Sequence, residues 1–511
     1  MLLPTLILFA SHVLTATSTH VRRTSPTVQL DNATFTGTGD GTINKFLGIP
    51  YVQPPTGDLR LRLPQPFSFY NASNGQAVTS YGSSCYQQQA SLPNLPGVPQ
   101  TVINFITNSV YAAVLPDSED CLTIDVILPA NATSTSKLPV LITLQWIYGG
   151  AFETGGTSKS NTGMLAARYD GTPIVQNAIG QGLPLIYVAM NYRLSAFGFM
   201  PGQEVKDAQI GNLGLQDQRQ AMRWVQRYIG QFGGDPTKVT IWGESAGAIS
   251  VALHMVANNG NNEGLFRGAI MQSGSPIPVG DIALGDVDDE GTLFALPTTN
   301  NITCALKQYP LRFQGSRAYF LSSTDALFQE YLQTIWFPRA NLSEIQEIMT
   351  LYPHDITAGS PFNTLVLNAY TLQYKRIAIF PQFAIWQAEY LVLWYVAMKL
   401  ANLAAFDNSR PDYIRDKALP FLGSVHSSDT TGEYKLGDDL TNYVVRFAVN
   451  LNPNGGGDLN WPQYTTQSPT LMTFLDGLTP LKLSQDTYRQ DAISYLGQLE
   501  LKYPLFNITG F

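Results

Sequence analysis

The chain has 511 residues, of which 44% are hydrophobic and only 13% are charged, and its formal net charge is -8. This composition is typical of a globular chain with a large apolar core and excludes an intrinsically disordered one. The acidic balance argues against a nucleic-acid partner, because binding to phosphates requires clustered Lys and Arg side chains.

An apolar run opens the chain, from Leu2 to Ala10, and small and polar residues follow it. The run is shorter than the roughly 20 residues that a membrane span needs, and Ala16-Thr17-Ser18 offers a cleavage site. We therefore expect residues 1–18 to be a signal peptide and the protein to be secreted and extracellular. The alternative is a short membrane anchor.

Six Asn-X-Ser/Thr sequons agree with export, because they are acceptors for N-linked glycans in secreted proteins: Asn32, Asn71, Asn131, Asn301, Asn341 and Asn507. The chain has three cysteines, Cys85, Cys121 and Cys304. They permit at most one intramolecular disulfide and leave one thiol over.

Regular secondary structure is predicted most clearly between about residues 138 and 275. Apolar, β-rich stretches and helical spacing of apolar residues predict strands at 138–148, 185–192, 238–242 and 268–272, and helices at 215–232 and 246–256. Gly233-Gly234-Asp235-Pro236 is expected to end the first of these helices. The alternation predicts an α/β fold whose largely parallel sheet has helices on both faces.

Gly243-Glu244-Ser245-Ala246-Gly247 matches the pattern G-x-S-x-G between a predicted strand and a predicted helix. This motif places a serine on a sharp turn, and small flanking residues let the strand and the helix pass close together. We therefore predict that Ser245 is a catalytic nucleophile. The alternative is a glycine-lined packing turn.

A nucleophilic serine that attacks an ester needs backbone N–H groups to hold the developing oxyanion. The N–H of Ala246, the residue after the serine, is one candidate. Gly150 and Ala151 are the others, because they lie in a glycine-rich loop after the strand predicted at 138–148. A GGA loop by itself would be read as an ordinary turn.

The base that activates such a serine is usually a histidine. His426 follows an apolar run, Ala418 to Val425, and comes after Ser245 in the chain, as the order Ser, acid, His requires. We therefore predict His426 as the base. Of the other histidines, His12 and His20 lie in or beside the leader. We interpret His254 as a packed helix residue and His354 as a turn residue.

The acid that orients the histidine should lie between the serine and the histidine. An acidic stretch there offers three candidates that local reasoning does not separate: Asp288, Asp289 and Glu290. A cluster of this kind is otherwise a solvated surface loop.

These motifs together resemble the type-B carboxylesterase/lipase family of the α/β-hydrolase fold, and most of all its secreted fungal lipases and esterases. The resemblance runs from about residue 40 to near the C-terminus. It is carried by the stretches Phe46 to Arg60, Glu119 to Leu122, Trp146 to Gly156, Asn191 to Phe199, Asn212 to Gln218, Phe232 to Gly247, Asp289 to Thr292, Tyr374 to Ile377 and Leu422 to Asp429.

The resemblance implies that Glu290, in the element Asp289-Glu290-Gly291, is the acid. It supports His426 and the oxyanion residues Gly150, Ala151 and Ala246. It also implies a disulfide between Cys85 and Cys121, closing a loop at 86–120 that acts as a lid and makes transient contact with a lipid interface in lipase-like members. No metal or cofactor is implied, and no zinc-site spacing of His or Cys is present.

The chain departs from this family pattern after the serine. Ser245 and Glu290 are 45 positions apart (290 minus 245), where the family has a long, mostly helical segment. We therefore expect residues 19–511 to form one type-B carboxylesterase domain that lacks a helical segment near 276–285. The stretch 304–322 also does not match. A gene model with a skipped exon and a retained intron, or a divergent deletion, would produce these departures.

The expected function is hydrolysis of a small-molecule or lipid carboxylic ester through an acyl-enzyme intermediate at Ser245. The alternative is a catalytically impaired or non-catalytic member of the same fold, owing to the missing segment. Long-chain lipase, sterol esterase and short-chain carboxylesterase are not separated by these motifs.

Overall fold

The computed structural model describes about half of the chain: residues 25–87, 116–144, 152–157, 170–272, 325–351, 405–407, 411–412, 439–465, 467–475, 481–485 and 490–503. None of the helices in these ranges combines the length and the apolar character that crossing a bilayer requires.

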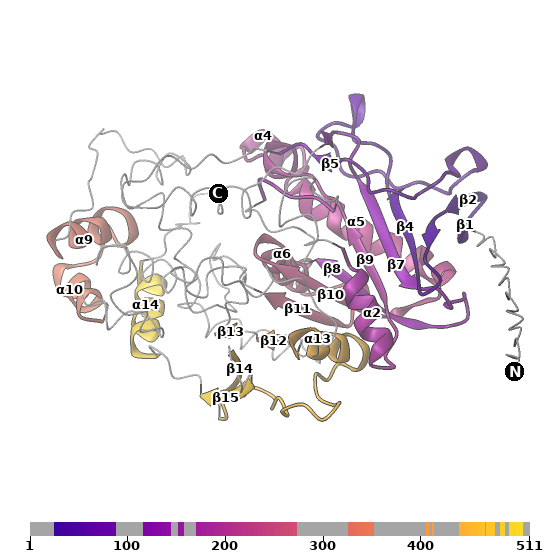
Figure 1. Cartoon of the computed structure of the whole chain (residues 1–511). Coiled ribbons are helices and arrows are strands. Elements are labelled where there is room, and N and C mark those ends of the chain that lie inside the picture. The colour runs from indigo at the N-terminus through magenta and orange to yellow at the C-terminus, as the bar shows by residue number, and fades with distance from the viewer. Residues whose placement is uncertain are drawn as a thin grey trace, which may run out of the picture.

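An eight-stranded sheet forms the centre of the described structure, in the order β12-β11-β10-β8-β9-β7-β4-β3 (Figure 1). Its strands are β3 (Thr38–Gly39), β4 (Ile43–Pro50), β7 (Thr123–Pro129), β8 (Leu138–Leu144), β9 (Ile186–Met190), β10 (Gly234–Glu244), β11 (Gly268–Gln272) and β12 (Ala405–Asp407).

The sheet is mixed. From β12 to β9 every neighbouring pair is parallel, and from β9 through β7 and β4 to β3 every pair is antiparallel. The parallel half is built from strands that alternate with helices, because a parallel pair needs a crossover connection. β3 and β4 are instead joined by the tight turn Asp40–Thr42, where the Asp40 carboxylate accepts from the N–H of Thr42 at 2.7 Å. The parallel arrangement predicted from the sequence is confirmed for β12, β11, β10, β8 and β9, the half of the sheet that leads to Ser245.

Helices cover both faces of the sheet: α2 (Thr172–Gly180) and α13 (Asp439–Asn450) on one, α5 (Leu213–Tyr228) and α6 (Ala246–Val256) on the other (Figure 1). The alternation of side chains along β10 separates the two layers. Thr240 donates its hydroxyl to the carbonyl of Ala448 in α13, whereas the backbone of Gly243 lies against Gly247 in α6.

Hydrogen bonds join the two helices within each layer. Asn177 of α2 donates its amide to Asn442 of α13 at 3.0 Å, and Gln218 of α5 donates to the hydroxyl of Ser250 of α6 at 3.2 Å. All residues of β7 and β9 are buried, as expected for strands covered on both faces. The core therefore runs through both sides of the sheet.

Smaller elements surround this core. They are β1 (Thr27–Leu30), β2 (Ala33–Thr36), β5 (Ser84–Cys85), β6 (Asp117–Ser118), β13 (Pro411–Asp412), β14 (Thr470–Leu475), β15 (Leu481–Gln485), α3 (Ser195–Phe199), α4 (Gln203–Asp207), α9 (Asp325–Tyr331), α10 (Leu342–Leu351) and α14 (Gln490–Lys502). Short 3-10 turns η1 (Gly57–Leu59), η2 (Ala72–Asn74) and η4 (Ile229–Phe232) and a π-helical turn η5 (Leu332–Trp336) complete them. β1 and β2 form an antiparallel hairpin, and α10 packs against α14.

Candidate active site

Ser245 is the single residue between β10 and α6, and its backbone has φ 54° and ψ -124°. Residues other than glycine adopt such a conformation at a cost of about 1–3 kcal/mol, and it persists only where the surroundings impose it. Here the N–H of Ser245 donates to the carbonyl of Gln272 in β11 at 2.9 Å, and its own carbonyl accepts from Ile249 at 3.0 Å. The turn is therefore fixed by the adjacent strand on one side and by the first helical hydrogen bond on the other.

The glycine before the serine is required by the close passage of strand and helix. A Cβ added to Gly243 would lie 2.2 Å from the carbonyl carbon and oxygen of Gly247 and 2.6 Å from the nitrogen of Ala248. All three atoms belong to the backbone of α6, so no side-chain movement would relieve the overlap. The geometry that G-x-S-x-G requires is present at 243–247.

Ala246 is the first residue of α6, and its side chain is buried. The first N–H groups of a helix have no acceptor within the helix, and the helix dipole favours negative charge at this end. The N–H of Ala246 is therefore at the positive end of the helix, directly after Ser245. Ser245 itself is 8% exposed, so little of its surface faces solvent.

The other predicted catalytic residues lie outside the described residues. They are Gly150, Ala151, Glu290 and His426. Also outside the described residues are the other candidate acids and the turn histidine (Asp288, Asp289 and His354), most of the predicted lid loop (88–115), the region of the missing segment (276–285), Cys304, and the sequons at Asn301 and Asn507. The convergence of Ser245 with Glu290 and His426, and the roles assigned to these residues, stay predictions.

His254 is a core residue, as predicted for a histidine on the helix after the serine. It is buried, and one ring nitrogen lies 2.8 Å from Oε1 of Gln218 on α5. Burial, together with the positive charge of Arg219, lowers the pKa of His254 to about 3. The ring is therefore neutral and bound between two helices.

The segment Phe152–Thr157 directly follows the predicted oxyanion loop in the chain. The carbonyl of Phe152 accepts from the N–H of Ser195 at 2.7 Å, and its ring packs on Phe199 with centroids 4.7 Å apart. At the other end the N–H of Thr157 donates to Oδ1 of Asn191 at 2.9 Å. Residues after β9 thus hold both ends of the segment.

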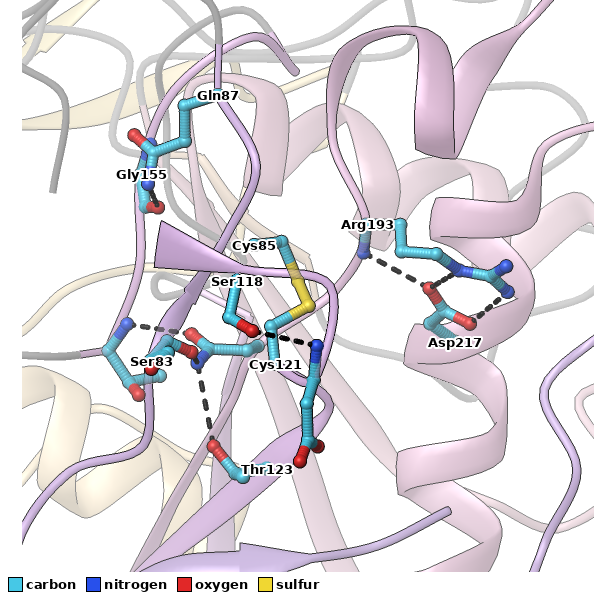
Figure 2. The surroundings of a disulfide bond; sticks show 12 residues. Ser83, Cys85, Gln87, Ser118, Cys121, Thr123, Gly155, Arg193 and Asp217 are labelled. Carbon is cyan, nitrogen blue, oxygen red and sulfur yellow. Dashed lines mark hydrogen bonds and ion pairs between the residues drawn. A yellow bond between two sulfur atoms is a disulfide. The ribbon is translucent and has the colours of Figure 1, made fainter. Parts of the chain in front are cut away.

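A buried ion pair follows Asn191 in the chain. Arg193 donates from Nε and Nη2 to the two carboxylate oxygens of Asp217 at 2.8 and 2.7 Å, and its N–H donates to the same carboxylate at 3.1 Å (Figure 2). This pair ties the end of β9 to α5. The sequence placed both residues in family-like stretches but assigned neither a role, because their pairing depends on the tertiary fold.

Cys85 and Cys121 form a disulfide, with Cα atoms 5.0 Å apart (Figure 2). Both are buried, and the N–H of Ser84 donates to the carbonyl of Pro116 beside them. The pairing implied by the family resemblance is therefore present. Within the described ranges, no group of three or more His, Cys, Asp or Glu side chains is placed to hold a metal ion.

Four of the sequons lie in the described part of the chain, and all four asparagines are exposed: Asn32, Asn71, Asn131 and Asn341. Two of them begin helical turns. Asn71 accepts from the N–H of Ser73 at 3.0 Å before η2, and Asn341 accepts from the N–H of Glu344 at 3.0 Å before α10.

Known proteins resemble this chain over most of its length. "Lipase 2" of Diutina rugosa is 33% identical over 570 residues, covering 92% of this chain and 96% of its own. "Secreted lipase 1" of Botryotinia fuckeliana is 32% identical, covering 88% and 89%. "Inactive carboxylesterase-like protein VdtD" of Byssochlamys spectabilis is 34% identical over 287 residues, 55% of this chain and 43% of its own.

The fold is shared with a solved structure, that of Aspergillus niger EstA. The two superpose with a TM-score of 0.65 at 22% sequence identity, covering 94% of this chain and 99% of the other. A sequence profile described as the carboxylesterase family matches residues 24–291. The chain therefore belongs to the carboxylesterase family and is a serine hydrolase of carboxylic esters with the α/β-hydrolase fold.

Proposed function

We propose that this protein cleaves carboxylic esters by two-step acyl transfer with Ser245 as the nucleophile. The observation that carries the proposal is the strained turn at Ser245, pinned between β11 and the start of α6. In the proposal His426 is the general base, Glu290 orients its ring, and the N–H groups of Ala246, Gly150 and Ala151 hold the oxyanion. The family profile, which spans Gly150 to Glu290, and the relatives that match most of the chain support these roles.

In the first step Oγ of Ser245 attacks the ester carbonyl carbon while His426 takes the hydroxyl proton. The carbonyl oxygen becomes an oxyanion, which the backbone N–H groups stabilise more strongly than the ground-state carbonyl. The tetrahedral intermediate collapses, the C–O bond breaks, and the alcohol leaves with the proton from His426. Water then attacks the acyl-enzyme with His426 as base, and the acid is released.

The serine is tested by Ser245→Ala, with Ser250→Ala in the helix that follows as a matched control. The hydroxyl of Ser250 donates to the carbonyl of Ala246 at 2.9 Å and accepts from Nε2 of Gln218 at 3.2 Å, so it has partners within the protein. Ser245→Ala is expected to abolish turnover of a p-nitrophenyl ester and covalent labelling by a fluorophosphonate, while the control keeps both. Labelling of a residue other than Ser245, or near-normal turnover in Ser245→Ala, would refute the assignment.

The substrate within this class is proposed to be a small-molecule or lipid ester, taken up with transient lipid-interface contact through a lid at 86–120. Relatives that carry the name lipase support a lipid ester. A series of p-nitrophenyl esters of increasing acyl length, measured below and above the solubility limit of each, tests both parts. A hydrolysis rate that rises sharply only above the solubility limit, where a substrate–water interface is present, supports the lid. A rate that does not change when the interface forms contradicts it.

Export is part of the proposal. Residues 1–18 would be removed as a signal peptide, residues 19–511 would remain as one domain, and the sequons would carry glycans. The name of a secreted lipase relative supports an extracellular location. N-terminal sequencing of the protein from culture medium, and its mass before and after an N-glycosidase, test these statements directly.

An impaired enzyme is the second candidate, because only 45 positions separate Ser245 from Glu290 (290 minus 245). A relative named as inactive supports this alternative, although it matches little more than half of this chain. Sequencing of the transcript across residues 272–325 tests whether the short connection is real. If it is, and the purified protein neither turns over esters nor reacts with a fluorophosphonate, the alternative replaces the proposal.

A further inference from the structure

Gln87 forms two hydrogen bonds with one residue, Gly155, that lies 68 positions away in the chain (Figure 2). Its Nε2 donates to the carbonyl of Gly155 at 2.6 Å, and the N–H of Gly155 donates to its Oε1 at 2.9 Å. The side-chain amide thus pairs with the donor and the acceptor of the same residue. Such a pair restricts both the position and the orientation of that stretch of backbone.

The backbone held in this way has an uncommon conformation. Gly155 has φ 129°, which L-residues rarely adopt, and Phe152 has φ 63°. Positive φ at a bulky residue such as Phe152 is strained and persists only where contacts impose it. The segment Phe152–Thr157 therefore depends on its neighbours for its shape.

A second amide joins the same two segments. Asn191 is fully buried, accepts from the N–H of Thr157 through Oδ1, and donates from Nδ2 to the carbonyl of Ser83 at 3.0 Å. Gln87 and Asn191 therefore link the arm Ser83–Gln87 to the segment Phe152–Thr157 at two points. Gln87 lies on the partly exposed side of this link and Asn191 on the buried side.

The arm is itself held firmly. Cys85 is joined to Cys121 by the disulfide, and β5 pairs with β6 through Ser84 and Asp117. Cys121 lies two residues before β7, a fully buried strand of the central sheet. Gly155 is therefore connected to the central sheet through the disulfide Cys85–Cys121 and the side-chain amide of Gln87.

We propose that Gln87 is a positioning residue for ester hydrolysis, because it holds the backbone that directly follows Gly150 and Ala151. This inference rests on the function proposed above, in which those residues donate to the oxyanion. Donors that are aimed at the transition state affect kcat more than KM. Removing one donor outright costs about 10²–10³ in kcat, so we expect loss of the Gln87 pair to cost less, roughly 10-fold.

The test uses the full chain with three substitutions. Gln87→Met has a side chain of similar size but no amide, and Gln87→Glu keeps an acceptor but, when ionised, has no donor for the Gly155 carbonyl. Gln29→Met on β1 is the matched control, since Gln29 is exposed and donates within its own hairpin. We expect Gln87→Met to lower kcat about 10-fold, to weaken a boronic acid inhibitor by a similar factor, and to leave KM within about twofold.

Gln87→Glu supplies a readout that a merely structural role would not move. A protonated carboxyl offers both a donor and an acceptor, so the ratio of its kcat to that of the wild type should rise as the pH falls toward 4. Amide exchange at Gly155 and Thr157 should be faster in Gln87→Met and unchanged in the control. These exchange rates do not depend on turnover.

Unchanged kcat and unchanged exchange in Gln87→Met, with an active wild type, would overturn the positioning role and leave the proposed function intact. A loss confined to KM or to thermal stability would overturn it too. A wild type without esterase activity would overturn the proposed function and with it the positioning role of Gln87 in hydrolysis. Faster exchange in Gln87→Met would still show that the amide clamp, the pair of hydrogen bonds between Gln87 and Gly155, holds this backbone.

Discussion

Asp125 is a buried acid whose neutralisation should stabilise the protein in a pH-dependent way. It lies in β7 with its side chain fully buried, and the N–H of Gly48 donates to its Oδ1 at 2.7 Å. Burial raises the pKa of Asp125, the hydroxyl of Thr157 and the N–H of Gly48 oppose this rise, and the charge of Asp170 adds to it. The net result is a pKa of about 7. Asp125→Asn keeps an oxygen for Gly48 and removes the charge.

The magnitude follows from the two ends of the folding reaction. The unfolded chain releases this proton near pH 3.8, whereas the folded protein holds it to about pH 7. Each tenfold change in the proton equilibrium is worth about 1.36 kcal/mol. The native state binds the additional proton, so the free energy of unfolding falls as the pH rises through this window, by roughly 4 kcal/mol in all. Below about pH 4 the carboxyl contributes no penalty.

Urea unfolding of wild type and Asp125→Asn at pH 4, 5 and 8 measures this term. We expect equal stability at pH 4, a gain for the variant of about 1–2 kcal/mol at pH 5, and a gain of roughly 4 kcal/mol at pH 8. The control is Asp58→Asn, an exposed acid, which should change stability by less than about 0.5 kcal/mol at any of these values. A variant less stable than wild type at pH 8, or a gain independent of pH, would refute the reasoning.

Three further tests by substitution follow from the same structure. His254→Gln should keep esterase activity within a few fold, whereas His426→Ala should lose about 10³-fold or more of kcat; equal losses would contradict the choice of base. Arg193→Met leaves the carboxylate of Asp217 buried without its cation and should cost about 3–5 kcal/mol in urea unfolding. Replacing Asp217 by Leu in the same chain should recover most of that loss. Ser245→Gly should be inactive yet about 1–2 kcal/mol more stable in urea unfolding than Ser245→Ala, because glycine relieves the strained turn; equal stability would argue against strain.

The fold around the nucleophile was predictable because its signals are local. The helix predicted at 246–256 has those bounds in the structure, and the strand predicted at 268–272 does too. The strand predicted to begin at Lys238 begins instead at Gly234. Gly233-Gly234-Asp235-Pro236 was expected to end the preceding helix, and β10 already pairs with β8 at Gly234 and again from Val239, with an irregular register between them. The strand extends through the turn-like residues because a register shift accommodates them.

The antiparallel half of the sheet and the amide clamp were not predictable in the same way. The strand β4 overlaps the family-like stretch Phe46 to Arg60, and β7 directly follows the stretch Glu119 to Leu122, but neither stretch indicates which strands pair. Gln87 and Asn191 act through backbone groups of distant segments, and no spacing rule connects a glutamine with a glycine 68 positions away. Such contacts are set by the tertiary arrangement, whereas a strand–turn–helix motif is set by neighbours in the chain.

The two sequons that begin helical turns affect how a non-glycosylated variant of this protein should be designed. Asn71 and Asn341 each use Oδ1 as a helix cap, and the N–H of Asn341 in turn donates to the carboxylate of Glu344 at 2.9 Å. Replacement of either asparagine by glutamine would remove the helix cap together with the site of glycan attachment. The resulting loss of stability could then be mistaken for an effect of the missing glycan. Aspartate caps helices as well as asparagine does, and it therefore separates the contribution of the sugar from that of the side chain beneath it.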